Sequence, residues 1–245
     1  MTGSVLRPFW LAVMLLTRLP APRVDTVRDE DMGRSLLAYP LVGLIVGGLL
    51  CLPAGLFPEA DGLLLAALVL VVWAVVTGAL HLDGLGDAAD GWLGGHGDAE
   101  RTLAIMQDPR SGSAAVVAIA GLLLVKFAAL GVLIEGGQWP ALLLAPVAGR
   151  IMPVLLFLTT DYVRRGGIST GIVAHLPRSS AWVLLAVVGL ALASYSLAAA
   201  AVVGVVFWLL RRLMVRRIHG CTGDTAGALV EITEAAWLVA LGLAL

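Results

Sequence analysis

The sequence predicts an all-α protein of the polytopic membrane class, with about seven to eight membrane segments. Apolar residues make up 60% of the chain and charged residues only 13%. Several apolar runs reach the roughly 20 residues that a helix needs to cross a hydrocarbon core about 30 Å thick. No internal repeat and no linker rich in proline, serine or charge interrupts them. We therefore expect a single integral-membrane domain over residues 1–245.

Short polar loops separate the apolar runs, and each run is expected to form a membrane segment. No small-residue cleavage site follows the first run, which predicts a short membrane segment or a half-buried anchor. Residues 181–210 would form a helix about 45 Å long, which is too long for one upright span. A tight hairpin near Ser194 would divide them into two spans. The predicted segments are 5–17, 36–57, 62–80, 113–134, 139–160, 181–193, 195–210 and 226–245.

Arginines alternate between successive loops and predict the orientation of the chain. The loop 18–35 contains four arginines, the loop 58–61 contains no basic residue, and the loop 81–112 contains arginines again. The positive-inside rule then places every arginine-bearing loop in the cytoplasm and the C-terminus outside. We expect a multi-pass inner-membrane protein whose polar motifs face the cytoplasm. The other arginine-bearing loops are 161–180 and 211–225.

The charged and sulfur-containing residues disfavour two further features. The formal net charge is −1, and the basic residues are scattered among loops without interleaved aromatic side chains. We therefore expect no nucleic-acid partner. The two cysteines, Cys51 and Cys221, fall in segments that the predicted topology keeps apart, so they predict neither a disulfide nor a cysteine-based metal site.

A cluster of aspartates follows the apolar run 62–80. Asp83, Asp87 and Asp90 are spaced i, i+4 and i+7, so they share one face if the helix continues. Carboxylates held this close repel one another unless a cation compensates. Carboxylate oxygens are the ligands that Mg²⁺ prefers, and Mg²⁺ commonly bridges to substrate phosphates. The cluster predicts magnesium-dependent phosphate chemistry at a membrane surface; the alternative is a solvated acidic cap on a membrane helix.

His81 stands at the start of the same segment. It would lie about 160° round the helix from the aspartate face. We consider two roles for it, a structural hydrogen bond and a catalytic one, and a single histidine more often has the first.

Residues 105–113, with the sequence IMQDPRSGS, lead directly into an apolar run. Arg110 offers a planar guanidinium suited to phosphate or carboxylate. Ser111 or Ser113 is expected to cap the following helix, whose N-terminal amides attract anions. The motif predicts a phosphate site; the alternative is an ordinary positive-inside arginine beside a serine cap.

The segment 220–231 opens the last span, with Asp224 at its start. Glu231 and Glu234 then lie one or two turns inside the span, where ionised carboxylates are costly and need partners. Lys126 and Arg150 are the only basic residues expected at that depth. These four residues predict either structural ion pairs or the lining of a polar cavity.

Five motifs lie along the chain: LTRLPAP (16–22), YPLVGLIVG (39–47), HLDGLGDAADG (81–91), RTLAIMQDPRSG (101–112) and RRIHGCTGDTAGALVEITE (216–234). Together they resemble the cobalamin synthase family, the adenosylcobinamide-GDP ribazoletransferases. They occur in the family's order along nearly the whole chain, and the blocks 81–91 and 220–231 are its specific signatures. Ala88 stands where many relatives have threonine, and Gln107 where a basic residue is common, so position 88 offers no hydroxyl and a phosphate contact from position 107 is weakened.

The resemblance implies the last joining step of cobalamin nucleotide-loop assembly. The family transfers the adenosylcobinamide phosphoryl group from adenosylcobinamide-GDP to α-ribazole or its 5′-phosphate, releases GMP and requires Mg²⁺. By this resemblance Asp83, Asp87 and Asp90 bind the metal, and Asp108 or Asp224 completes its coordination or orients the acceptor. These three aspartates and His81 are the catalytic candidates. The residues expected to bind substrate are Asp108, Arg110, Ser111, Lys126, Arg150, Asp224, Thr225 and Glu231.

Two other functions stay open at this point. A CDP-alcohol phosphotransferase-like enzyme also uses aspartates at a membrane-helix end, although its DxxDGxxAR run differs from the DxxxDxxDG spacing here. A divalent-cation transporter would use acidic clusters as ion sites, but it predicts inverted repeats that the sequence lacks. Besides the substrates and the lipid bilayer, the partners to consider are a second copy of the chain and other cobalamin-assembly enzymes.

Overall fold

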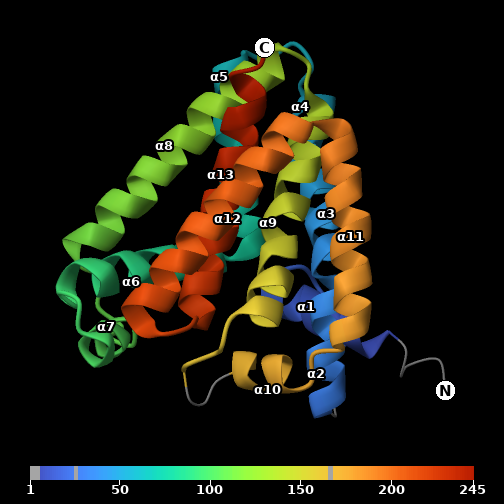
Figure 1. The fold of residues 1–245 in the computed structure, drawn as a ribbon. Helices are drawn as coiled ribbons and strands as arrows, with labels where there is room; N and C mark the ends of the chain where they lie inside the picture. The colour runs from blue at the N-terminus through green and yellow to red at the C-terminus, as the bar shows by residue number, and fades with distance from the viewer. Residues whose placement is uncertain (1–5, 25–26, 165–167) are drawn as a thin grey trace.

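The computed structural model describes residues 6–24, 27–164 and 168–245 (Figure 1). Over these ranges the chain is helical, and its single β-type contact is an isolated bridge between Tyr162 and Cys221. Both Cys51 and Cys221 are free thiols. The all-α class is therefore confirmed, and the long apolar helices described next fit the polytopic membrane class.

Six helical runs of the described chain are long and apolar enough to cross a membrane, or seven if a bent pair is counted as one span. The bent pair is α5 (Gly62–Thr77) and α6 (Leu80–Gly94). The other runs are α2 (Asp29–Ser35) continued by η1 (Leu36–Ala38), α3 (Tyr39–Leu50) and α4 (Leu52–Leu56); α8 (Ser113–Glu135); α9 (Trp139–Thr159); α11 (Arg178–Tyr195); α12 (Leu197–Ile218); and α13 (Gly223–Gly242).

The structure shows how the first apolar run and the run 181–210 are folded. Helix α1 (Arg7–Leu16) is about 15 Å long, too short to cross a bilayer, so of the two predicted roles it fits the half-buried anchor. The run 181–210 is divided as predicted, because Ser196 is extended between α11 and α12. The Ser196 hydroxyl accepts a hydrogen bond from the backbone of Ala199 and so caps α12.

Four segments expected to be loops are partly helical. The loop 18–35 contains α2 (Asp29–Ser35). The loop 81–112 contains α6 and α7 (Ala99–Ile105), and the loop 161–180 contains α10 (Ile168–Ala174). Helix α12 continues to Ile218, well beyond the apolar run that predicted it. Apolarity marks only the part of a helix that lies in lipid, so polar turns beyond it escape a hydropathy argument.

Helix α9 is the centre of the bundle and packs against α3, α11, α12 and α13. The outer helices α11 and α12 carry exposed apolar side chains such as Val187, Leu190 and Val205, as expected for surfaces in contact with lipid. One end of the bundle holds α2, α7 and α10, and the opposite end holds α4 and the C-terminus (Figure 1). We call the first the arginine-rich end, because the arginine-bearing connections meet there.

Helix α6 lies across the arginine-rich end of the bundle. Gly78 and Ala79 both have left-handed backbone angles, with φ of 60° and 55°, and the chain turns by 88° between α5 and α6. Because α6 runs at nearly a right angle to α5, it adds little to the depth of that span, in keeping with the prediction that the loop 81–112 lies outside the membrane. It packs against α8 and α13, which brings the aspartate motif onto the start of the last span.

Close approach of α3 and α9 depends on two glycines four residues apart. A Cβ atom on Gly43 would lie 2.7 Å from the carbonyl oxygen of Pro146, and one on Gly47 would overlap the carbonyl oxygen of Leu143. Small residues at this spacing let membrane helices pack backbone to backbone.

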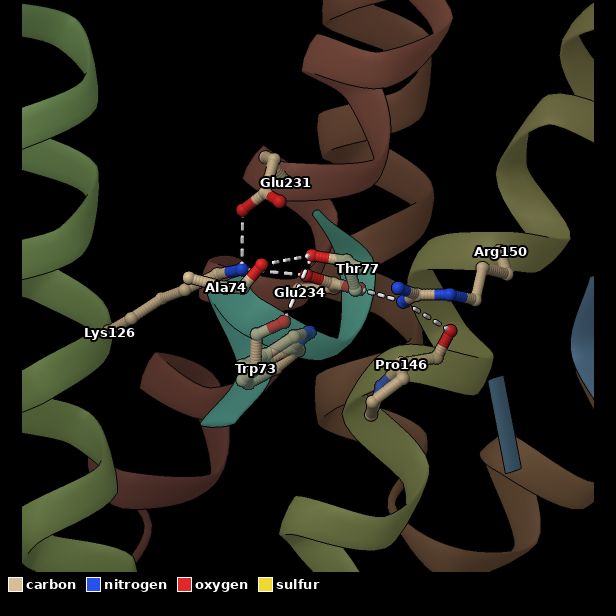
Figure 2. Close-up of polar contacts among 8 residues, drawn as sticks. All are labelled: Trp73, Ala74, Thr77, Lys126, Pro146, Arg150, Glu231 and Glu234. Atoms are coloured by element: carbon tan, nitrogen blue, oxygen red, sulfur yellow. Dashed lines mark hydrogen bonds and ion pairs between the residues drawn. The ribbon is translucent and has the colours of Figure 1, made fainter. Parts of the chain in front are cut away.

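Four charged side chains meet midway along three spans in one network of ion pairs (Figure 2). Lys126 of α8 donates from Nζ to Glu231 Oε2 at 2.5 Å and to Glu234 Oε2 at 2.6 Å, both on α13. Arg150 of α9 pairs through Nη1 with Glu234 Oε1. All four residues are 4% exposed or less. Two cations balance two carboxylates, so the network has no formal net charge.

Of the two roles that the sequence left open for these residues, the structure shows the ion pairs. The ring of Trp73 lies against Lys126, with Nζ 4.2 Å from the ring centroid, and adds a cation–π contact. Nε and Nη2 of Arg150 have no hydrogen-bond partner among the described residues. The network fixes α8, α9 and α13 relative to one another, because sliding any of them would separate buried charges.

Replacing Gly47 is predicted to destabilise the bundle, whereas replacing its neighbour is not. Gly47→Ala forces the α3 and α9 backbones apart and should cost roughly 1–3 kcal/mol. Gly48→Ala is the matched control, since nothing lies within 4 Å of a Cβ there. The measurement is the melting temperature of detergent-solubilised protein; equal melting temperatures for the two variants would show that the close approach is not needed.

Removing one carboxylate of the network should be far more harmful than removing an ion pair. Glu234→Gln leaves Arg150 buried without a carboxylate, and we expect a loss of roughly 3–5 kcal/mol. The double variant Arg150→Met/Glu234→Leu keeps the charge balance and should recover much of that loss. Glu100→Gln, an exposed change on α7, is the control. A double variant that melts below Glu234→Gln contradicts the charge-balance argument.

Candidate active site

A cavity of about 370 Å³ opens at the arginine-rich end, where α6 crosses the start of α13. Its apolar wall comes from the end of α1, the start of α3 and the last turns of α9, and includes Tyr39 and Phe157. This volume lies in the range typical of small-molecule sites. The polar residues that line it are His81, Asp83, Tyr162, Arg164, Ser169 and Asp224.

Two of the predicted aspartates line the cavity at this crossing, one from each helix, whereas Asp87 and Asp90 are not among its lining residues. Asp83 on α6 is exposed to the cavity, and Asp224 lies in the first turn of α13. The crossing is close because residue 84 is a glycine: a Cβ there would lie 2.8 Å from the carbonyl oxygen of Asp224. The start of α13 is fixed by a capping box in which Thr222 and Thr225 bond reciprocally. The Thr225 hydroxyl, predicted to bind substrate, is buried in this cap.

Asp87, one turn after Asp83, is held in a negative environment. Partial burial, followed by the charges of Asp83 and Asp224, raises the pKa of Asp87 to about 6. The nearby guanidinium of Arg164 opposes this shift only in part. A carboxylate in such a position gains from any cation that binds beside it.

Asp90 has a different role from the metal ligand that the spacing suggested. Its Oδ2 accepts from the backbone amide of Gly112 at 2.6 Å, and its Oδ1 accepts from that of Ala115 at 3.0 Å. Asp90 therefore caps the N-terminus of α8 from another helix. The expectation that Ser111 or Ser113 caps α8 is wrong, because Gly112 is the N-cap residue and no side chain of its own segment takes part. The anion that the N-terminal amides of α8 attract is therefore the Asp90 carboxylate.

Asp108 and Arg110 pair with each other outside the cavity. Arg110 donates from Nε and Nη2 to the Asp108 carboxylate at 2.9 and 2.6 Å, while its side chain is 87% exposed. These bonds lower the pKa of Asp108 to about 2. Neither residue lines the cavity, and the buried residues Lys126, Arg150 and Glu231 do not line it either.

His81 lies in the wall of the cavity, on the side of α6 that packs against α13. It is 6% exposed, and its Nδ1 has no hydrogen-bond partner within the described part of the chain. Gly227 of α13 lies beside the His81 backbone, and a Cβ at residue 227 would be in ordinary van der Waals contact with it, at 3.4 Å. His81 is therefore close to the aspartates but enclosed, whereas Asp83 is open to solvent.

Sequence reasoning missed the part of the site formed by Tyr162, Arg164 and Ser169. The Asp224 carboxylate accepts a hydrogen bond from Nη1 of Arg164 at 2.8 Å. Tyr162 and Ser169 line the same cavity. Burial raises the pKa of Tyr162 above its usual value. The arginine was noticed only as a topology signal. No spacing in the sequence links it to Asp224, because the two are 60 residues apart.

No three His, Cys, Asp or Glu side chains of residues 6–24, 27–164 and 168–245 are grouped closely enough to form a metal site as they stand. Magnesium binding therefore stays a prediction. The oxygen-rich donor set at the α6–α13 crossing, formed by Asp83, Asp87 and Asp224, has the chemistry that Mg²⁺ requires.

Comparisons with known proteins agree with the motifs. The family model for cobalamin-5-phosphate synthase matches residues 8–242. A protein called adenosylcobinamide-GDP ribazoletransferase from Pseudomonas putida (strain W619) is 52% identical to this chain, over 97% of this chain and 98% of the relative. A protein of the same name from Pseudomonas entomophila (strain L48) is 51% identical, over 96% of this chain and 98% of the relative. A relative from Stutzerimonas stutzeri (strain A1501) is 52% identical over 96% of this chain and 98% of its own. No solved structure matches.

The family match covers every element of the cavity, from the end of α1 to the start of α13. The resemblance seen in the motifs is thereby confirmed, and so is the prediction of a transferase. The chain belongs to the cobalamin-5-phosphate synthase family.

Proposed function

We propose that this chain transfers the adenosylcobinamide phosphoryl group from adenosylcobinamide-GDP to α-ribazole or its 5′-phosphate, with release of GMP. The observation that carries the proposal is the acidic cavity at the α6–α13 crossing, because both specific family motifs meet there. The names of the relatives supply the donor and the ribazole acceptor. No feature of the cavity favours a CDP-alcohol substrate or cation transport over this reaction.

The site has the donor set for one magnesium ion between two helices. Asp83 and Asp224, which line the cavity, and Asp87, one turn after Asp83 on α6, would hold it, while Asp90 positions α8 against α6. When bound, Mg²⁺ neutralises charge on the diphosphate oxygens. This assignment keeps Asp83, Asp87 and Asp224 of the predicted ligand set and omits Asp90, since both oxygens of Asp90 already accept backbone hydrogen bonds.

The transfer itself requires a base and a leaving group. The ribose 5′-oxygen attacks the phosphorus on the cobinamide side of the diphosphate, and the bond from that phosphorus to the bridging oxygen breaks as GMP leaves. A carboxylate of the cluster takes the hydroxyl proton. Asp83 is the best placed of these, because it is open to the cavity whereas His81 is enclosed.

The volume of the cavity determines which parts of the substrates can bind inside it. A volume of about 370 Å³ suits a nucleoside and its phosphates but not a corrin ring. The aromatic side chains of Tyr39, Phe157 and Tyr162 offer planar surfaces for a nucleoside base. The corrinoid would then lie at the open mouth of the cavity.

We also propose that the arginine-rich end faces the cytoplasm and that the chain lies in the inner membrane. The positive-inside rule supports this orientation, because the arginine-bearing connections meet at one end of the bundle. Soluble nucleotide substrates would then reach the cavity directly.

Asparagine at any of the three proposed ligands should remove most activity. With purified protein, adenosylcobinamide-GDP, α-ribazole and Mg²⁺, we expect GMP and adenosylcobalamin, detected by mass. Asp83→Asn, Asp87→Asn and Asp224→Asn should each lower the rate of GMP release by about 100-fold or more. Glu100→Gln removes one carboxylate at the same end but outside the cavity, and should keep the wild-type rate.

Two results would contradict the proposal. The reaction is wrong if the wild-type protein makes no cobalamin under conditions that support a known synthase. The ligand assignment is wrong if correctly inserted asparagine variants keep near-normal magnesium-dependent GMP release.

A further inference from the structure

The cavity contains a single guanidinium or ammonium group among its described lining residues, that of Arg164. A nucleoside diphosphate ester carries negative charge that a metal ion alone does not neutralise. The other cations first expected to bind phosphate are engaged elsewhere. Arg110 points into solvent beside Asp108, and Lys126 is held by two glutamates deep in the bundle.

The contact between Arg164 and Asp224 uses only part of each side chain. Nη1 of Arg164 lies 2.8 Å from Oδ2 and 3.1 Å from Oδ1 of Asp224. Among the described residues no partner is found for Nε or Nη2, although a guanidinium has five N–H donors. The Arg164 side chain is 32% exposed, against 16% for Asp224. The group is therefore held at the cavity wall with unused donors.

The backbone next to Arg164 is fixed to the start of α13. Val163 donates to the carbonyl oxygen of Cys221 at 3.0 Å, and Cys221 donates to that of Asp161 at 2.8 Å. Gly220 permits this approach, because a Cβ there would overlap the Asp161 carbonyl oxygen. Arg164 is thus presented to the cavity by a short paired segment rather than by a free loop end.

We propose that Arg164 is the residue that binds the diphosphate of the GDP-activated donor, exchanging its contact with Asp224 for phosphate oxygens when the donor enters. This inference rests on the proposed function. The exchange has two effects: a planar guanidinium meets the phosphate oxygens that suit it, and the Asp224 carboxylate becomes available to a metal ion. Before the donor enters, the pair neutralises a carboxylate that lies close to Asp83 and Asp87.

Donor binding, measured without turnover, tests the role of Arg164. In equilibrium dialysis with GDP and with adenosylcobinamide-GDP, Arg164→Gln should raise both dissociation constants about tenfold or more. The effect on GDP should persist when EDTA replaces Mg²⁺, because the guanidinium contacts phosphate itself. Arg164→Lys should restore part of the affinity, since it keeps the charge but not the planar fork. Arg101→Gln, an exposed change on α7, should leave binding unchanged.

Steady-state kinetics separate this role from a purely structural one. For a donor-binding residue, Arg164→Gln raises KM for the donor while KM for α-ribazole stays within about twofold. If the ion pair only anchors residues 161–164 to α13, the melting temperature falls and both KM values change alike, which overturns the proposal. If Arg164→Gln is not recovered folded, Arg164→Lys decides by the same ratio of KM values.

The failure of this inference differs from the failure of the proposed function. Wild-type protein that turns over adenosylcobinamide-GDP, combined with unchanged donor binding in Arg164→Gln, rejects the role of Arg164 alone. Wild-type protein that gives no GMP rejects the reaction.

Discussion

The buried network of Lys126, Arg150, Glu231 and Glu234 is the constraint on which the rest of the structure depends. A charge buried without a partner inside a membrane bundle costs several kcal/mol, so these four groups allow only one register of α8, α9 and α13. Glu231 follows Asp224 by seven residues on one helix, about 10 Å along it. By fixing α13 at its middle, the network also fixes where Asp224 stands at its end.

The buried network also determines where the aspartate motif lies, because α8 connects the network to α6. Lys126 holds the middle of α8, and Asp90 of α6 caps its first turn through two backbone amides. Helix α6 is thereby tied to both neighbours, to α8 by its carboxylate and to α13 by the close contact at Gly84. The cavity aspartates are presented by helices whose positions are fixed on both sides, which is the rigidity that a metal-binding site needs.

Much of this was predictable from the sequence, and the exceptions share one cause. Apolar runs predicted the spans, the excess length of 181–210 predicted the break at Ser196, and the burial of Glu231 and Glu234 predicted cationic partners. The helical spacing placed Asp90 with Asp83 and Asp87, but it could not show that α8 begins beside Asp90 and uses both its oxygens. Arg164 was missed for the same reason, because its partner Asp224 is brought close only by the tertiary fold.

Both proposals require the diphosphate of the donor to bind between α6 and α13, beside Asp83, Asp87 and Asp224. An experimental structure of the protein with Mg²⁺ and adenosylcobinamide-GDP would test this. We expect density for the phosphates and one ion in the 370 Å³ cavity, with Arg164 turned from Asp224 to a phosphate oxygen. Phosphates bound elsewhere, with no ion beside the three aspartates and Arg164 still paired with Asp224, would contradict it.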